Sequence, residues 1–121
     1  MPKQSYNEQM TQTHVLRLFT AGRYTVDLKT GIVTGRTGMQ LMTYSDKSGY
    51  QWLRLFDQPY IIALAIHRLV WIIGSEQEIP DGFVIHHIDG NIENNSFENL
   101  ICVSHPDHYK LHNQIEEEIP F

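Results

Sequence analysis

The stretch VIHHIDGNIENN, residues 84–95, constrains the fold more than any other part of the chain. It opens as an apolar strand that contains two neighbouring histidines and continues into an Asp-Gly-Asn turn. Because adjacent residues of a strand point to opposite faces of a sheet, His86 and His87 are expected to have different roles.

The residues after this stretch predict a second strand and a helix. Residues 100–103 are apolar and follow an asparagine-rich loop. Ser104 is a candidate helix N-cap with Pro106 in the first turn, and the helix is predicted to run to about residue 116. On it His108 and His112 are four residues apart and share a face, which is the spacing at which two imidazoles can bind one metal ion.

This arrangement predicts a division of labour among the histidines. If the first strand packs on the helix, His86 faces His108 and His112 as a metal ligand, and His87 is left as a free base. Metal-assisted phosphodiester hydrolysis needs both a cation on the phosphate and a separate base near neutral pKa. Asn99 is expected to fix either the loop or the His87 ring.

Residues 1–74 are strand-rich. The sequence predicts a helix over 8–21, a hairpin over 23–35, strands over 39–44, 49–56 and 60–65, and a helix over 66–74. A polar link, residues 75–82, then leads to the histidine segment. The predicted fold class is α+β: a small N-terminal antiparallel sheet module with flanking helices in residues 1–74, followed by a two-strand and helix motif in residues 75–115.

Charge is distributed unevenly between the two halves. Residues 1–70 hold eight Lys and Arg against four Asp and Glu, a net charge of +4, whereas residues 71–121 hold one lysine against ten acids, a net charge of −9. A basic half joined to an acidic, histidine-rich half indicates that one part holds a polyanion while the other has a different role. The candidate polyanion contacts are Arg23, Lys29, Arg36, Lys47, Arg54 and Arg68.

Cysteine content and hydropathy exclude several classes of protein and bear on the cellular compartment. The single cysteine excludes a disulfide framework and a cysteine-built zinc site within one chain. The polar N-terminal residues do not form a signal peptide, and no apolar run is long enough to span a membrane. The expected location is the cytoplasm.

Together, VIHHIDGNIENNSFENL and the histidines that follow it resemble the HNH, or ββα-metal, nuclease motif. The upstream segments LFTAGRYTVDLKTGIV, KSGYQWLRL and AIHRLVWIIG also resemble small phage-type HNH proteins of the homing-endonuclease kind, in which an AP2-like or related sheet module precedes the nuclease motif. The resemblance covers roughly residues 15–113.

The resemblance implies roles for individual residues. His87 becomes the general base, His86 and His108 become metal ligands, and Asn99 supports the loop. Many phage members have Asp and Asn at the two ligand positions, whereas paired histidines with a third at the position of His112 are similar to the nuclease colicins. One divalent ion is therefore expected: zinc, nickel, cobalt or manganese if three imidazoles bind it, and magnesium if oxygen ligands prevail.

Several polar residues near the motif have simpler interpretations. His112 could equally be a solvated helix residue, and His105 is expected at the surface. Asp89 and Asn95 are interpreted as turn and loop residues rather than ligands. His67 is expected to pack in the interior, while its neighbour Arg68 has the reach to bind a phosphate.

The C-terminal residues QIEEEIPF have no evident role in a nuclease. An acidic run that ends in Ile-Pro-Phe resembles the C-terminal tip of bacterial single-stranded-DNA-binding proteins, which replication and repair proteins bind through a basic rim and an apolar pocket. The alternative is a solubilising acidic tail. The candidate partner-binding residues are Glu116, Glu117, Glu118, Ile119, Pro120 and Phe121.

The sequence thus predicts a metal-dependent DNA endonuclease from a phage or mobile element, acting in a bacterial host cell. Two alternatives remain: a DNA-binding module that kept the fold without catalysis, and an interaction protein that competes for tip-binding host proteins through its C-terminus. Intact His87 beside a complete set of candidate ligands favours the enzyme.

Overall fold

The computed structural model describes residues 8–106. The elements in chain order are α1 (Glu8–Thr20), β1 (Tyr24–Val26), β2 (Val33–Gly35), β3 (Tyr44–Ser45), β4 (Gln51–Asp57), β5 (Tyr60–Ala65), α2 (Ile66–Ser75), β6 (Phe83–His87), the 3-10 helix η1 (Phe97–Asn99) and β7 (Leu100–Ser104). The predicted α+β class is confirmed. His108, His112 and the tail residues 116–121 lie outside the described range, as does nearly all of the helix predicted after Ser104.

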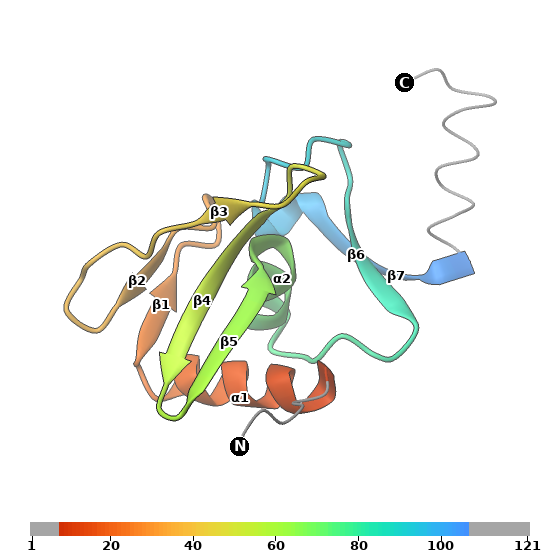
Figure 1. The fold of residues 1–121 in the computed structure, drawn as a ribbon. Coiled ribbons are helices and arrows are strands. Elements are labelled where there is room, and N and C mark those ends of the chain that lie inside the picture. The colour runs from red at the N-terminus through yellow and green to blue at the C-terminus, as the bar shows by residue number, and fades with distance from the viewer. Residues whose placement is uncertain (1–7, 107–121) are drawn as a thin grey trace.

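The strands form three small antiparallel sheets around α2 (Figure 1). One sheet is the β1–β2 hairpin, the second has the order β3-β4-β5, and the third is the β6–β7 hairpin. Helix α2 packs against α1, β4, β5, β6 and β7, so it joins the first half of the chain to the histidine segment. Its buried face consists of Ile66, Leu69, Val70 and Ile72.

A single apolar core runs through both halves of the chain. It includes Val15 of α1, Leu53 and Leu55 of β4, and Ile85 and Leu100 of the β6–β7 hairpin. The core therefore crosses residue 74, where the sequence suggested a functional division between a DNA-holding module and a nuclease motif. That division remains a prediction about function.

One predicted strand is much shorter than expected. Only Tyr44 and Ser45 of this region pair with β4, and Gln40 makes an isolated bridge to Thr34. The apolar residues that suggested a longer strand do not face a core, because Met39 is 73% and Met42 is 89% exposed. Within residues 8–106, no helix is long and apolar enough to cross a membrane.

Candidate active site

The two neighbouring histidines stand at the end of β6, and both border one cavity of about 270 Å³, here called the site cavity. In the β6–β7 register, His87 pairs with Leu100 and His86 with Ile101. His87 is buried, whereas His86 is half-buried. The site cavity is also lined by Tyr50, His67, Arg68, Val84, Ile85, Gly90 and Ile92.

A buried hydrogen bond fixes the His87 ring. Its Nε2 lies 2.8 Å from Oδ1 of Asn95, and the two residues are 4% and 7% exposed. The ring also lies against other aromatic rings, with centroid distances of 4.9 Å to His67 and 6.0 Å to Tyr50. The sequence predicted Asn95 only as a loop residue, and the signal that could have found it is the Asn94-Asn95 pair, seven and eight residues after His87.

Asn99, by contrast, holds the loop of residues 88–99 and not the histidine ring. Its Oδ1 accepts from the Asp89 N–H at 3.1 Å, and its Nδ2 donates to Asp89 Oδ1 and to the Asn94 carbonyl, each at 2.9 Å. Its own carbonyl accepts from the Ile88 N–H at 2.8 Å. Of the two roles left open for Asn99 by the sequence, the contacts are those of loop support.

Asp89 is the acceptor around which the same loop closes. The Asn94 side chain, the Asn91 N–H and the Asn99 side chain all donate to its carboxylate, at 2.9, 2.8 and 2.9 Å. These hydrogen bonds, with that of Asn94 the largest cause, hold the pKa of Asp89 below its usual value because they favour the charged carboxylate. Asp89 is exposed, so its role in the structure is to close the turn.

His67 was expected to pack against other residues, and its half-buried ring packs beside that of the catalytic candidate. It lies on α2, with its ring centroid 5.2 Å from that of Tyr50 and 4.9 Å from that of His87. Burial, followed by the charges of His87 and Arg68, lowers the pKa of His67 to about 4, while Asp46 acts in the opposite direction. At neutral pH the ring is uncharged.

The candidate DNA-binding residues are dispersed over the first half of the chain. Lys29, Arg36, Lys47 and Arg54 are exposed, and the Arg54 guanidinium lies 4.5 Å from the centre of the Tyr44 ring. Arg23 instead binds the Asp57 carboxylate, with Nη1 to Oδ1 at 3.2 Å. Arg68 is half-buried and lines the site cavity.

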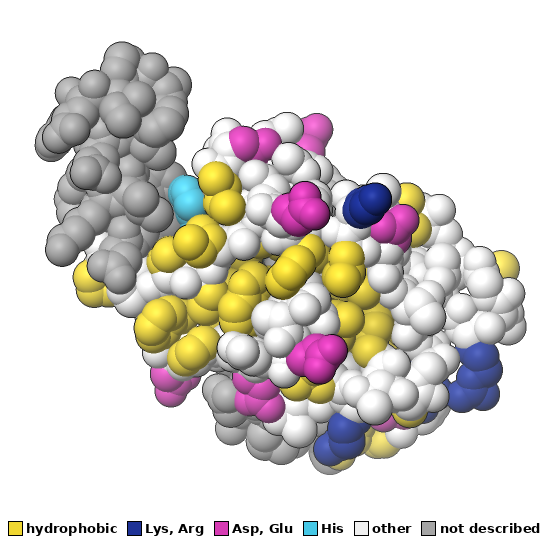
Figure 2. Space-filling view, turned by 180° about the vertical axis from the view of Figure 1, so that it is seen from behind, with side chains coloured by type: hydrophobic (Ala, Val, Ile, Leu, Met, Phe, Trp, Pro, Cys, Tyr) yellow, Lys and Arg dark blue, Asp and Glu magenta, His cyan; other side chains and the backbone are white. Residues whose placement is uncertain are grey.

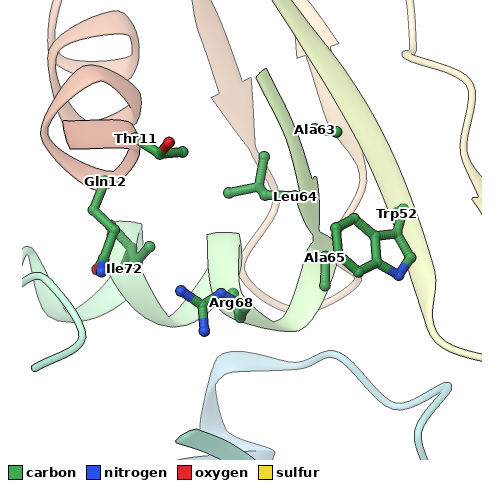
Figure 3. A pocket seen from close by; sticks show the side chains of 8 residues that line it. All are labelled: Thr11, Gln12, Trp52, Ala63, Leu64, Ala65, Arg68 and Ile72. Atoms are coloured by element: carbon green, nitrogen blue, oxygen red, sulfur yellow. The ribbon is translucent and has the colours of Figure 1, made fainter. Parts of the chain in front are cut away.

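A second cavity, of about 180 Å³, lies between α1, α2 and the β4–β5 hairpin (Figure 3). Its lining is mainly apolar, and Arg68 is its one titratable side chain. It therefore lacks the histidines that line the site cavity.

Comparison with known proteins places the site cavity in a recognised motif. Residues 64–110 match the family model described as HNH endonuclease. This segment is therefore similar to the HNH endonuclease motif. It includes α2, the His86–His87 pair, the loop of residues 88–99 and His108, which confirms the HNH prediction.

The chain is also similar to two known endonucleases. The chain is 45% identical over 51 residues to intron-associated endonuclease 3 of Enterobacteria phage RB3, a match that covers 38% of this chain and 19% of that protein. The solved structure of the HNH homing endonuclease I-HmuI, described for its DNA binding and cleavage, matches with a TM-score of 0.62 and 29% identity over 81% of this chain and 55% of that chain. The chain thus spans about a fifth of the first relative and about half of the second.

Proposed function

We propose that the chain is a metal-dependent DNA endonuclease that hydrolyses phosphodiester bonds. The observation that carries this proposal is the His87 imidazole, held in place within an HNH motif at a cavity that His86 and Arg68 also border. DNA binding and cleavage by the similar enzyme I-HmuI support the choice of substrate.

In the proposed mechanism, His87 takes the proton from the attacking water and Arg68 contacts a phosphate oxygen at the cavity. Asn99 keeps the loop closed beneath them through its bonds to Asp89 and Asn94. A positioned base of this kind contributes about 10²- to 10⁴-fold to the rate.

A divalent metal ion is the cofactor that an HNH motif implies. His86 suits this ion because its imidazole borders the site cavity beside the base, and we propose His108 and His112 as the other ligands. Within residues 8–106, no three His, Cys, Asp or Glu side chains are grouped so that they could hold a metal. The other two proposed ligands, His108 and His112, lie outside this range. When bound, the ion would polarise the phosphate and stabilise the leaving oxygen.

The test is incubation with supercoiled plasmid and a panel of zinc, nickel, cobalt, manganese and magnesium salts. We expect nicked or linear plasmid with at least one metal, and a rate about 10²- to 10⁴-fold lower for His87→Ala. Calorimetry should show that this variant still binds metal, whereas His86→Ala and His108→Ala bind it weakly. Near wild-type cleavage by His87→Ala would refute the assigned base, and plasmid that is bound but never cut would favour the binding-module alternative.

We further propose that residues 1–74 hold the DNA, as an AP2-like module of a phage or mobile-element protein in the bacterial cytoplasm. The three-stranded antiparallel sheet β3-β4-β5 packed on α2 supports this proposal, as do the exposed Lys29, Arg36, Lys47 and Arg54.

For the tail, we propose docking on host proteins that bind the tip of single-stranded-DNA-binding protein. Its support is the sequence EEEIPF alone, because residues 116–121 lie outside the described range. Deleting Phe121 should abolish pull-down of a tip-binding host protein without changing plasmid cleavage. Equal pull-down with and without Phe121 would leave only a charged tail.

A further inference from the structure

In the described part of the chain the His87 ring has one hydrogen-bond partner, the Asn95 Oδ1 atom, and this oxygen can only accept. The Asn95 Oδ1 lies 2.8 Å from Nε2, so Nε2 must carry the proton of the neutral ring. The other ring nitrogen, Nδ1, then keeps its lone pair. An imidazole acts as a base only through the nitrogen that lacks a proton, so the Asn95 contact determines which atom of His87 can do so.

The turn between β1 and β2 lies close against the Asn95 side chain. Gly31 of this turn is buried with φ +81°, and a Cβ added there would lie 3.3 Å from Cβ of Asn95 and 3.1 Å from Cγ2 of Ile66. Two residues beyond Asn95, the Phe97 N–H donates to the Leu28 carbonyl at 2.8 Å. The turn of residues 27–31 therefore touches the asparagine loop at two points.

Hydrogen bonds within residues 27–31 stabilise the turn. The Asp27 carbonyl accepts from the Gly31 N–H at 2.7 Å and from the Thr30 N–H at 3.2 Å, and the Asp27 carboxylate accepts from the Lys29 N–H at 2.8 Å. Only glycine adopts the Gly31 conformation without strain and also leaves room for Asn95. The hydrogen-bonded turn of residues 27–31 thus packs against the loop that contains Asn95, the partner of His87.

We propose that Asn95 is a positioning residue that fixes the His87 imidazole as its Nε2–H tautomer, and that the turn around Gly31 sets the place of Asn95. This inference rests on the proposed function for its catalytic meaning, because His87 is the base only if the chain is a nuclease. It assigns a role in the active site to a turn more than fifty residues away in the sequence.

The first test is ¹⁵N NMR of the metal-free protein at about pH 8, above the ordinary pKa of histidine. Wild type should show His87 as the Nε2–H tautomer, and so should Asn95→Asp, whose carboxylate also accepts. Asn95→Ala should lose this preference. The control Asn91→Ala removes an exposed side chain whose hydrogen bond, among residues 8–106, is to the Glu93 N–H, and should leave the His87 signals unchanged. A wild-type Nδ1–H tautomer, or an unchanged tautomer in Asn95→Ala, would overturn the proposal.

The second test uses plasmid cleavage. Asn95→Ala should lower the single-turnover rate about 10- to 100-fold at unchanged DNA affinity, and Asn95→Asp should restore much of it. Wild-type rates in Asn95→Ala would overturn the positioning role. If no variant or wild-type protein cuts DNA but the tautomer depends on Asn95 as expected, the proposed function is wrong and the fixed tautomer stands.

Glycine variants test the support under Asn95. Gly31→Ala should disturb the His87 tautomer in the same NMR experiment, because the added methyl group meets Asn95 and Ile66. Gly38→Ala is the matched control: its φ is +89°, so it carries the same backbone strain, but a Cβ there has nothing within 4 Å. Equal His87 spectra for the two variants would remove the turn from the proposal.

Discussion

At the scale of single residues, the site cavity combines two imidazoles in different environments. His87 is hydrogen-bonded to Asn95, whereas His67 is half-buried on α2 and its pKa is lowered to about 4. Because folded His67 stays neutral where the unfolded chain would bind a proton, its burial makes stability depend on pH.

We predict that stability falls as the pH drops from about 6.5 toward 4, since in this window the unfolded state binds more protons than the folded state. His67→Gln should flatten this part of the profile. The measurement is the free energy of unfolding in urea at pH 8 and pH 5. His105→Gln removes an exposed imidazole, so between pH 8 and pH 5 this variant should lose as much free energy of unfolding as the wild type does. If His67→Gln lost as much free energy of unfolding as the wild type between pH 8 and pH 5, His67 would not be the cause of the pH dependence.

At the scale of elements, α2 and η1 approach each other at Gly74. A Cβ on Gly74 would lie 2.8 Å from Cγ and 2.6 Å from Cε1 of the Phe97 ring. Phe97 begins η1, which ends at Asn99. The small size of Gly74 therefore lets α2 lie close to the segment that anchors the loop of residues 88–99. An alanine there would displace the whole ring.

Gly74→Ala should therefore destabilise the protein by about 1–3 kcal/mol, as overpacking does. The same change at an unobstructed helix position stabilises by about 0.5–1 kcal/mol. Urea unfolding of a double-mutant cycle with Phe97→Ala is the measurement, because removing the ring should make Gly74→Ala neutral or stabilising. A stabilised Gly74→Ala single variant would contradict the close approach.

At the scale of the whole molecule, one face of the protein exposes a hydrophobic patch. Figure 2 shows hydrophobic side chains gathered across the middle of the back face, with Lys and Arg groups standing apart at its margins. The exposed cations proposed to hold DNA belong to the turns and strands of the first half of the chain: Lys29, Arg36, Lys47 and Arg54.

Reversing the charges of Arg36 and Arg54 together to glutamate should weaken DNA binding at low salt and reduce its dependence on salt, because phosphate contacts release counterions. Gel-shift titrations at several salt concentrations measure both effects. Arg17→Glu, an exposed position on α1 outside the proposed contacts, should have less effect. If the double variant binds as wild type does, another surface holds the DNA.

The sequence by itself determined most elements and the core of the motif. Helical periodicity predicted α1 and α2, and alternation predicted the hairpins. The His-His-Ile-Asp-Gly pattern placed the candidate catalytic residue at the end of β6. These features are readable because each depends on residues close together in the chain. The strand expected over 39–44 failed, because alternation alone cannot show whether a face will be covered, and here Met39 and Met42 stay exposed.

Only the tertiary structure decided what holds His87. Its partner is Asn95 and not Asn99, because the curve of the loop brings the first amide to Nε2 and turns the second onto Asp89. Gly31 and Asn95 lie close together in space although they are far apart in the sequence. A local sequence pattern cannot predict a contact between such distant residues. Which side chains share a buried space is set by packing of the whole chain, so it emerges only when the core has formed.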